Sequence, residues 1–465
     1  MPLTRAAARS KQDTPDTGKT EATGARELLA LHIIQELRSH GHRAYLVGGC
    51  VRDRLLGIAP KDYDVSTSAT PQQILSIFPD AQTVGAHFGV VLVNRPEGVH
   101  VKVATFRSES AYADGRHPDQ VRFETEPALD AQRRDFTVNG LMQDPISGEV
   151  LDFVNGQADL AKKIIRAIGD PRLRFREDHL RMLRAVRFAA RFGFAIEAET
   201  LTAIQQLAVF ICKISAERIR DEIVRILTEG NARRGFELLD ETGLLIQVLP
   251  EIKALQGVQQ PPEYHPEGDV WTHVLMMLER LHSPTPTLAL GVLLHDVGKP
   301  PTFRVADRIR FDGHAEVGAR MTEKRLSQLR FSNDDVEQIT SLVANHMRFK
   351  DVRQMRTSTL KRFLCLPKFE EHLELHRLDC LASNGYTDAY EYVQHKLREF
   401  SEEELRPVRL ITGRDLVAAG YKPGPALGRA LEAVETAQLD GEIHTRDEAI
   451  ALAKSVLDSS GTRHA

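Results

Sequence analysis

The sequence of 465 residues contains few cysteines and no long apolar run. The four cysteines include no Cys-x-x-Cys pair, which is typical of a reduced, cytoplasmic protein and not of a disulfide framework. No apolar run reaches the length needed to cross a bilayer, so we expect no membrane partner. The formal net charge of −4 shows no overall excess of basic residues. Any contact with a nucleic acid must therefore come from local basic patches.

The composition and length are those of a globular protein with several domains. Hydrophobic residues make up 42% of the chain and charged residues 27%, as in soluble globular proteins. A chain of this length suggests roughly three or four domains. Residues 1–25 mix small and polar side chains and lack the apolar core of a secretion signal. We therefore expect a disordered tail over this range.

Two acidic residues at a spacing of two, Asp62 and Asp64, form the first candidate site. A short apolar strand is expected over 45–47, and a second strand is expected to carry both acids. Side chains at positions i and i+2 of a strand point to the same side, so the two carboxylates would lie next to each other. They repel one another unless a cation lies between them, and oxygen ligands suit Mg²⁺. An isolated Asp-x-Asp is more often a solvated turn, so the interpretation depends on the surrounding residues.

A diglycine turn and an arginine, Gly48, Gly49 and Arg52, precede the acidic pair. Such a turn lets backbone amides approach a phosphate closely. Together with the two carboxylates, this order predicts a nucleotidyl-transfer site in which two metal ions activate an attacking hydroxyl and neutralise charge on a triphosphate.

The same stretch resembles a known family. GGCVRD followed by KDYDVST is similar to the signature of the class II nucleotidyltransferases, which include tRNA CCA-adding enzymes and bacterial poly(A) polymerases. The resemblance continues to near the C-terminus. It implies an α+β fold, in which a small nucleotidyltransferase head with a mixed β-sheet is followed by an extended all-α neck, body, HD and tail region. It also implies that Gly48, Gly49 and Arg52 bind the nucleotide and that Asp62 and Asp64 hold Mg²⁺.

The periodicity of the first part of the chain predicts both helices and strands. Apolar residues at helical spacing predict a helix over 26–40, and Thr70 followed by Pro71 is a typical helix start. Alternation of apolar and polar residues predicts strands over 88–93 and 99–106. The head is therefore expected to contain a small sheet.

A polar, turn-rich stretch over 107–123 fits an ordinary surface loop on composition alone. By the resemblance, its core of Asp114, Gly115 and Arg116 is the flexible element that CCA-adding relatives need to add the final adenosine. This favours full CCA addition over the addition of cytidines alone.

Arg134 and Asp135 lie downstream of the acidic pair. By the resemblance, Asp135 is the third carboxylate of the metal site and Arg134 contacts the nucleotide phosphates. Arginine suits this role because its rigid fork of donors matches phosphate oxygens. The alternative is a surface Arg-Arg pair.

The basic stretch from 162 to 194 predicts a helix with one arginine-rich face. On a single helical wheel that starts at Asp178, the residues Arg181, Arg184 and Arg187 lie opposite an apolar face. The segment EDHLR resembles the family's EDxxR motif, which implies that Asp178 and Arg181 read the base while the following arginines hold phosphate. A carboxylate can accept from the exocyclic amino group of cytosine or adenine, which uracil and guanine do not offer in the same place. Such a protein selects CTP and ATP without a template.

Histidine and aspartate residues recur on apolar segments in the second half of the chain. A lone histidine there is usually a core or surface residue, but a His-Asp pair with several further histidines can bind a transition metal from facing helices. The pattern resembles the HD superfamily of metal-dependent phosphohydrolases, in which such a site activates water against a phosphoester. The alternative is a vestigial domain that binds no metal. The ligands that the resemblance implies are His273, His295, Asp296, His314, His346 and Asp379.

The leading hypothesis is the addition and repair of the 3′-terminal CCA of tRNA from CTP and ATP. Alternatives are a poly(A) polymerase, an enzyme that adds only CC or only the terminal A, and, from another class, an RNA-binding phosphohydrolase. The oligomeric state stays open. Arginines such as Arg218, Arg220 and Arg225 are interpreted mostly as surface residues. The expected segments are a tail at 1–25, the head at 26–154, a nucleotide-selecting neck at 155–215, a helical body at 216–262, the HD domain at 263–395 and a tRNA-binding helical tail at 396–465.

Overall fold

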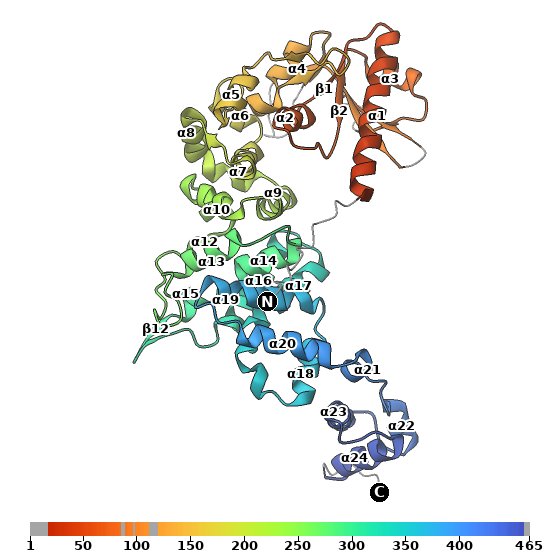
Figure 1. Cartoon of the computed structure of the whole chain (residues 1–465), viewed down its shortest axis with the longest axis vertical. Coiled ribbons are helices and arrows are strands. Elements are labelled where there is room, and N and C mark those ends of the chain that lie inside the picture. Colours follow the sequence, from red (N-terminus) through yellow and green to blue (C-terminus); the bar gives the residue numbers. More distant parts are fainter. Residues whose placement is uncertain (1–16, 85–88, 96–97, 111–119, 460–465) are drawn as a thin grey trace, which may run out of the picture. The chain divides into compact units, whose positions relative to one another are not determined.

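The protein contains strands and helices in its first part and mainly helices in the rest, which confirms the predicted α+β class. Figure 1 shows the elements of the computed structural model in chain order. The described residues are 17–84, 89–95, 98–110 and 120–459.

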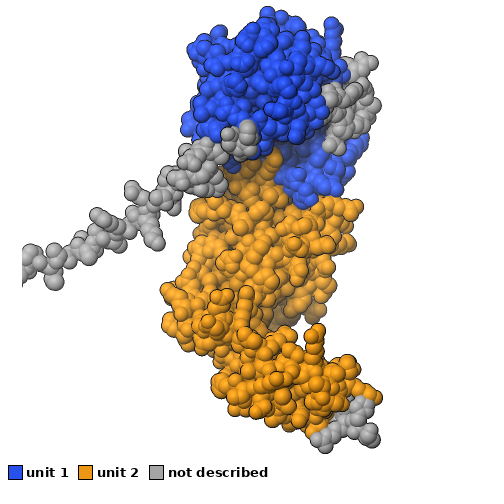
Figure 2. Space-filling view, turned by 90° about the vertical axis from the view of Figure 1, so that its right-hand side faces the viewer, with its two compact units in different colours: residues 1–222, 237–248 blue, residues 223–236, 249–465 orange. Residues whose placement is uncertain are grey.

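Two compact units make up the chain, and Figure 2 colours them separately. The first comprises the residues up to Glu222 together with Glu237–Val248. The second comprises Ile223–Phe236 together with the residues from Leu249 onward. The six segment boundaries expected from the sequence stay a prediction.

Among the described residues, the first unit contains one large sheet, the two short strand pairs β6-β7 and β10-β11, and the helices around them. Its strands are β1 (Ala44–Val47), β2 (Asp64–Thr67), β3 (Gln82–Thr83), β4 (Val90–Asn94), β5 (His100–Thr105), β6 (Arg107–Ser110), β7 (Gln120–Phe123), β8 (Met142–Gln143), β9 (Val150–Leu151), β10 (Ile164–Ile165) and β11 (Ala195–Ile196). Its helices are α1 (Thr17–Ser39), α2 (Gly49–Leu55), α3 (Pro71–Ile77), α4 (Pro127–Gln132), η2 (Thr137–Asn139), α5 (Gly156–Lys162), α6 (Pro171–Glu177), α7 (Leu180–Phe192), α8 (Ala198–Leu207), η3 (Ala208–Lys213) and α11 (Leu245–Val248). Two more helices belong partly to each unit, α9 (Ala216–Thr228) and α10 (Ala232–Glu241).

Seven strands form a mixed sheet in the order β3-β4-β5-β2-β1-β8-β9. Strand β2 pairs antiparallel with β1 and parallel with β5. Every second side chain of β4 is buried, and β5 follows the same alternation, as a sheet with one covered face requires. Helix α1 packs against β1, β2 and β5 (Figure 1). The sheet fixes the end of β1 and the start of β2, where the first candidate site lies.

The helix starts follow local chemistry. The Thr70 hydroxyl caps α3 by accepting from the Gln73 amide, and the Gln73 side chain accepts from the Thr70 amide in return, as the sequence predicts. Helix α1 begins at Thr17, so the prediction of a disordered tail is wrong for residues 17–25; the rest of that prediction, residues 1–16, lies outside the described residues. Extending an existing helix costs far less than nucleating one, and the packed part of α1 supplies the nucleus.

The arginine-rich stretch forms two helices and not one. Helix α6 ends at Glu177 and α7 begins at Leu180, while Asp178 between them is extended, with φ −152° and ψ 105°. A carboxylate of Asp178 accepts from the Leu180 amide at 3.0 Å and so satisfies a free donor at the start of α7. The single helical wheel drawn from Asp178 is therefore wrong, although the arginines of α7 keep their helical spacing.

The second unit is built mainly from helices around α14, whose residues are buried from its first turn to its last. Over the described ranges, no helix combines the length and the apolar character needed to span a membrane. The elements are α12 (Pro250–Lys253), α13 (Val270–Glu279), α14 (Pro286–Leu294), α15 (Lys299–Thr302), β12 (Arg304–Val305), β13 (Ile309–Arg310), α16 (His314–Gln328), α17 (Asn333–Asn345), η4 (His346–Gln354), α18 (Thr357–Leu364), α19 (Phe369–Ala382), α20 (Asp388–Glu399), α21 (Glu402–Leu405), α22 (Gly413–Ala418), α23 (Pro425–Asp440) and α24 (Arg446–Ser459).

Candidate active sites

The acidic pair lies at the start of β2. Tyr63 is buried between Asp62 and Asp64, so the two aspartates project to the other side of the chain. Asp62 is exposed, with 82% of its side chain accessible. Burial raises the pKa of the Asp64 carboxyl, against the opposing charges of Lys102 and Arg134. Two hard oxygen donors, one of which is costly to leave charged, fit a divalent cation such as Mg²⁺.

Gly48 and Arg134 form the turn beside this pair. Gly48 has φ +72°, and a Cβ atom there would lie 3.0 Å from Nη1 of Arg134. Arg134 donates to Asp130 at 3.0 Å and to Ser66 at 3.3 Å. Its Nε is buried and has no hydrogen-bond partner among the described residues. Glycine at position 48 thus leaves room for a guanidinium that faces the nucleotide-binding turn expected from the sequence.

Arg52, which the sequence predicts to bind the nucleotide, is 3% exposed and engaged inside the protein. Its guanidinium donates to Asp53 at 2.6 and 2.8 Å and to Asn139 at 2.5 Å. It also lies over the ring of Phe192, 4.5 Å from the centroid. The guanidinium of Arg52 is therefore committed to internal partners, and its direct contact with a nucleotide stays a prediction.

Asp135 is held by Arg184 and Asn139. It accepts from Nη2 and Nε of Arg184 at 2.6 and 2.9 Å and from Asn139 at 3.0 Å. Burial pushes the pKa of Asp135 upward, but the charge of Arg184 and these hydrogen bonds outweigh it and hold the pKa well below its usual range. Among the described residues, Asp62, Asp64 and Asp135 do not form a group whose carboxylates all lie within 4.8 Å of one another. Asp135 is instead paired with Arg184, and its place as a third carboxylate of the metal site stays a prediction.

The two predicted base-reading residues contact other partners. Asp178 accepts from Arg218 at 2.7 and 3.2 Å, while Arg181 donates to Glu177 and to the Arg174 carbonyl, the latter at 2.9 Å. Both side chains are partly exposed, at 16% for Asp178 and 12% for Arg181. The sequence interpreted Arg218 as a surface residue, and nothing local in the sequence indicates its pairing across 40 residues.

The last arginine of α7 is internal. Arg187 is 4% exposed and donates from Nε to Glu222 at 2.7 Å. Arg184 also approaches Glu222, at 3.8 Å, in addition to Asp135. The guanidinium of Arg187 thus pairs with the carboxylate of a neighbouring helix, and its contact with a substrate phosphate stays a prediction. Asp114, Gly115 and Arg116 lie outside the described residues.

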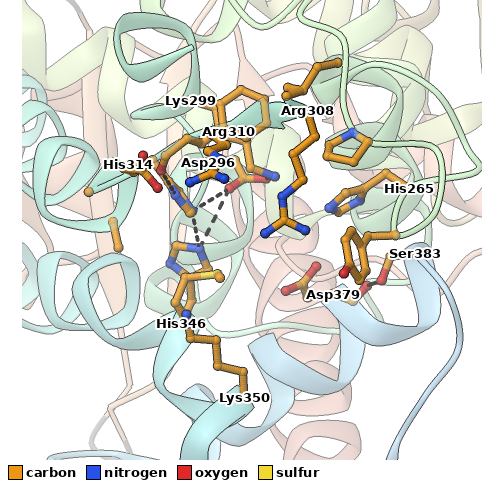
Figure 3. A pocket seen from close by; sticks show the side chains of 18 of the residues that line it. His265, Asp296, Lys299, Arg308, Arg310, His314, His346, Lys350, Asp379 and Ser383 are labelled. Carbon is orange, nitrogen blue, oxygen red and sulfur yellow. Dashed lines mark hydrogen bonds and ion pairs between the residues drawn. The ribbon is translucent and has the colours of Figure 1, made fainter. Parts of the chain in front are cut away.

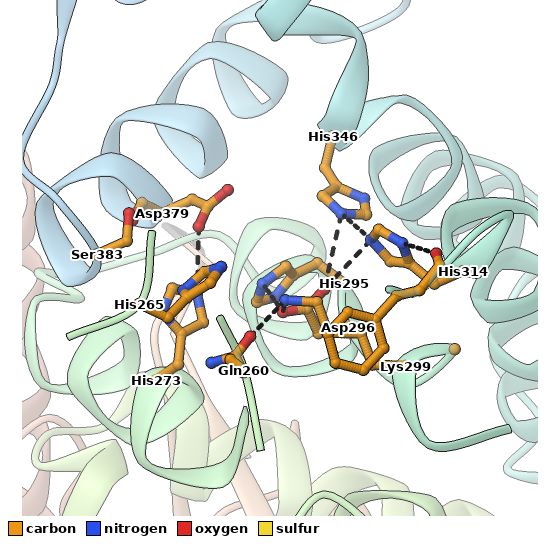
Figure 4. A network of polar contacts seen from close by, with 12 residues as sticks. Gln260, His265, His273, His295, Asp296, Lys299, His314, His346, Asp379 and Ser383 are labelled. Carbon is orange, nitrogen blue, oxygen red and sulfur yellow. Dashed lines mark hydrogen bonds and ion pairs between the residues drawn. The ribbon is translucent and has the colours of Figure 1, made fainter. Parts of the chain in front are cut away.

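Six histidine and aspartate residues that the sequence singles out converge in the second unit (Figure 4). They come from the ends or faces of five helices: His273 on α13, His295 and Asp296 just after α14, His314 at the start of α16, His346 just after α17, and Asp379 on α19. Their ligand atoms form two groups, in each of which all atoms lie within 4.8 Å of one another: His273, His295 and Asp379 in one, Asp296, His314 and His346 in the other.

Backbone carbonyls fix the tautomers of three of these histidines. In His295, His314 and His346, Nδ1 lies 2.7 to 2.8 Å from the carbonyl oxygen three residues earlier. A carbonyl can only accept, so Nδ1 carries the proton and Nε2 of the neutral ring presents a lone pair. Burial lowers the pKa of His346 to about 3, which keeps this ring neutral.

Two of these lone pairs face each other and a carboxylate. Nε2 of His314 lies 3.2 Å from Nε2 of His346, and both lie near one oxygen of Asp296, at 3.6 and 3.8 Å. Two acceptors and a buried anion at these distances fit a divalent transition metal. Gly298 allows this approach, because a Cβ atom there would lie 2.0 Å from the His314 carbonyl oxygen.

Two further residues, which the sequence did not predict, contact the cluster and orient it. Glu267 accepts from Nδ1 of His273 at 2.7 Å, while Asp379 lies 3.1 Å from its Nε2. Burial opposes the charged form of His273, but these two carboxylates outweigh it and raise its pKa to about 9. Lys299 is buried and lies 2.7 Å from Asp296. Only the short spacings, six residues before His273 and three after Asp296, could have indicated these two partners.

The cluster opens into a cavity of about 730 Å³ (Figure 3). Asp296, His314, His346 and Asp379 line it. Cationic side chains (Lys299, Arg308, Arg310 and Lys350) line it as well, beside the acids Asp312 and Glu316, so the cavity combines a ligand cluster of imidazoles and carboxylates with walls of both charges.

Comparison with known proteins decides the family. A model described as "Poly A polymerase head domain" matches residues 44–166, which contain the acidic pair. The CCA-adding enzyme of Limosilactobacillus reuteri (strain DSM 20016) is 32% identical over 413 residues, which are 88% of this chain and 92% of that enzyme. This chain belongs to the CCA-adding enzyme family. It is therefore an enzyme with the nucleotidyltransferase head that the sequence predicts.

Other members and solved structures agree with this CCA-adding assignment. The CCA-adding enzyme of Geobacillus sp. (strain WCH70) is 43% identical over 217 residues, 47% of this chain and 53% of that enzyme, so this match spans about half of the relative. The crystal structure of the Bacillus stearothermophilus CCA-adding enzyme in complex with CTP has a TM-score of 0.69, 28% identity, and coverage of 93% of this chain and 97% of that chain. The Thermotoga maritima CCA-adding enzyme complexed with tRNA_CCA shares the fold, with a TM-score of 0.56 at 19% identity and coverage of 95% and 98%.

Later parts of this CCA-adding family member match two further models. One, described as "Probable RNA and SrmB- binding site of polymerase A", matches residues 193–256, and a model of tRNA nucleotidyltransferase domain 2 matches residues 315–453. The second range contains His346 and Asp379 but not His273 or His295. The histidine cluster is therefore assigned from its geometry and not from these models.

Proposed function

We propose that this protein adds and repairs the 3′-terminal CCA of tRNA, using CTP and ATP without a template. Its family membership supports this proposal, as do relatives solved with CTP and with tRNA. The observation that carries it is the Asp62 and Asp64 pair beside the Gly48 turn and the Arg134 guanidinium. A cytoplasmic location belongs to the same proposal and agrees with the four free cysteines.

In this reaction the 3′ oxygen of the tRNA forms a bond to the α-phosphorus of the nucleotide. The bond from the α-phosphorus to the bridging oxygen breaks, pyrophosphate leaves, and the hydroxyl proton passes to water. Mg²⁺ held by Asp62 and Asp64 would activate the hydroxyl and neutralise the developing charge. Arg134 would hold phosphate oxygens through its free donor edge. Asp135 acts on the site through Arg184 and Asn139, which it orients.

Base selection is assigned to Asp178 and Arg181. The Asp178 carboxylate would accept from the amino group of cytosine or adenine, and Arg181 would donate to a ring nitrogen or carbonyl. Arg218 holds the Asp178 carboxylate in place before the base arrives. A base without the amino group loses this hydrogen bond to a charged acceptor, which discriminates against it.

An Asp62→Ala variant tests the proposed transferase site. We expect no nucleotide incorporation into a tRNA transcript that lacks CCA, with unchanged thermal unfolding, because Asp62 is exposed and its removal costs little stability. Asp80→Ala is a matched control, since Asp80 is another exposed acid of the same unit. Incorporation by the Asp62→Ala variant at the rate of the control would reject the assignment.

We also propose a metal-dependent phosphohydrolase activity at the histidine cluster. The facing Nε2 lone pairs of His314 and His346 beside Asp296 carry this second proposal. A transition metal bound there would supply an activated water for attack on a phosphoester. With that metal added, the wild-type protein should hydrolyse a small aryl phosphate, and His295→Ala should not. His282→Ala, at an exposed histidine of the same unit, should retain activity; equal rates for all three proteins would reject the site.

A further inference from the structure

The wall of the histidine-cluster cavity includes Arg308, whose side chain has no ion pair or hydrogen bond with a described residue. Strands β12 and β13 pair antiparallel, and Ala306, Asp307 and Arg308 form the loop between them. Asp307 accepts two hydrogen bonds from Arg310, at 2.8 and 2.9 Å. The acid nearest to Arg308 in the chain is thus already neutralised. No described residue forms an ion pair or side-chain hydrogen bond with Arg308, and Figure 3 shows its side chain extending into the cavity.

A second cation lines the same cavity from another element. Lys350 lies in η4, four residues after His346, and is exposed. Like Arg308, it forms no ion pair within the described part of the chain, and it lines the cavity together with Arg308. By contrast, Lys299 is buried against Asp296 and Gln260, both at 2.7 Å. The charge of Lys299 is therefore neutralised by Asp296, whereas the charges of Arg308 and Lys350 are available to a ligand.

Two acids outside the cluster, Asp312 and Glu316, line the cavity as well, but its size and the cations of Arg308 and Lys350, which form no ion pair with a described residue, favour a ligand larger than one phosphate. A volume of about 730 Å³ is that of a pocket for a drug-sized molecule. A metal at the cluster would neutralise the phosphate that reacts, and Arg308 and Lys350, which form no ion pair with a described residue, would remain for a second anionic group. Arginine favours phosphate because its fork of donors matches two phosphate oxygens at once.

We propose that Arg308 and Lys350 bind a second phosphate group of the substrate, separate from the phosphate that is hydrolysed. This inference rests on the proposed phosphohydrolase activity. The substrate class is a phosphoester that carries two phosphate groups, and it has two sources: a phosphorylated 3′ end of RNA, whose second phosphate is the preceding diester, or a nucleoside bisphosphate. In the reaction a water oxygen forms a bond to the terminal phosphorus, the ester P–O bond breaks, and the alcohol oxygen takes a proton. The second phosphate is not changed.

Steady-state kinetics with three substrates test the proposal on the full chain. The substrates are an aryl phosphate with one phosphate group, a nucleoside 3′,5′-bisphosphate and a 3′-phosphorylated RNA trinucleotide. Arg308→Met should raise KM for a substrate with two phosphates about 10-fold to 100-fold, the loss of one charged hydrogen-bonded contact. Values of kcat, and kcat/KM for the aryl phosphate, should change by less than about twofold. Comparison of kcat/KM for the bisphosphate with kcat/KM for the trinucleotide distinguishes a nucleoside bisphosphate from a phosphorylated RNA end as the source of the substrate.

Arg304→Met is the matched control, because Arg304 pairs with Arg310 across the same hairpin but does not line the cavity. Lys350→Met should act in the same direction as Arg308→Met. Three results would overturn the proposal. They are an equal loss of kcat/KM in Arg308→Met for the aryl phosphate and for both two-phosphate substrates, an unchanged KM of Arg308→Met for the two-phosphate substrates, or an equal effect of Arg304→Met.

A binding measurement tests the second phosphate site independently of the proposed hydrolase activity. A wild-type protein that hydrolyses none of the substrates with added metal refutes the hydrolase activity. In the His295→Ala background, a fluorescent 3′-phosphorylated trinucleotide should still bind, and adding Arg308→Met should weaken its binding by about tenfold, as for one lost charged contact. Equal binding with and without Arg308→Met would refute the second phosphate site on its own.

Discussion

Replacing Asp178 by asparagine should relax the choice of base without unfolding the protein. The carboxylate accepts from Arg218 at 2.7 and 3.2 Å and from the Leu180 amide at 3.0 Å. Asparagine keeps an oxygen for the Leu180 amide but loses the charge that attracts Arg218. The side chains of this ion pair are 16% and 25% exposed, so the loss should cost at most about 1 kcal/mol of folding stability.

The effect on substrate choice should be larger. A hydrogen bond to a charged group contributes about 1.5–3 kcal/mol, so CTP should lose about 10-fold to 100-fold in kcat/KM. The asparagine amide can in addition donate to the carbonyl that uracil carries in place of the amino group of cytosine. The ratio of kcat/KM for CTP to that for UTP should therefore fall by at least about 10-fold.

The assay measures kcat/KM for CTP and UTP separately on a tRNA transcript that lacks CCA, with thermal unfolding of each protein as the stability control. Arg218→Met is the companion variant. It should weaken CTP use but keep the preference for CTP over UTP, because the Asp178 carboxylate remains. A folded Asp178→Asn protein with an unchanged ratio of CTP to UTP would refute the base-reading role.

Four further changes have defined outcomes. Gly48→Ala should cost about 1–3 kcal/mol of backbone strain at φ +72° and displace Arg134, which a raised KM for CTP would reveal. Arg187→Met leaves Glu222 buried without its main partner and should lower the free energy of unfolding in urea by about 3 kcal/mol; a loss below about 1 kcal/mol would contradict the buried pairing. Burial lowers the pKa of His372 to about 4. The unfolded chain therefore binds a proton on this ring near pH 6.5, whereas the folded protein binds it only near pH 4. Stability should therefore fall by up to about 3 kcal/mol as pH drops through this window, and His372→Gln should flatten that fall in unfolding measurements made at each pH. A chelator selective for transition metals should abolish phosphoester hydrolysis while nucleotide addition continues in Mg²⁺, and loss of both activities would contradict separate metal sites.

The features that the sequence predicts well depend on local patterns. Alternation in β4 and β5 reports burial of one face of the sheet, and Thr70 with Pro71 reports a helix start. The convergence of the histidine cluster is also predictable, because the His295-Asp296 pair and His346 each follow the last turn of a helix that buries apolar residues. Residues in such positions converge when the helices pack.

The features that the sequence predicts poorly depend on partners far along the chain. An arginine-rich helix face has the same pattern whether the guanidiniums meet phosphate or internal carboxylates, and Arg187 meets Glu222 35 residues later. The helical wheel starts at Asp178, yet this residue is extended and its side chain accepts from the Leu180 amide at the start of the next helix. Asp135 was assigned to the metal site by resemblance, and its ion pair with Arg184 forms only in the folded chain.

The most direct measurement supplies labelled CTP or ATP separately to three tRNA transcripts that end before CCA, after the first C and after the second C. We expect CTP alone to complete the two cytidines on the first two transcripts and to leave the third unchanged. We expect ATP alone to add a single adenosine to the third transcript and none to the others. Runs of adenosine on any transcript, or no adenosine on the third, would contradict the proposed CCA addition.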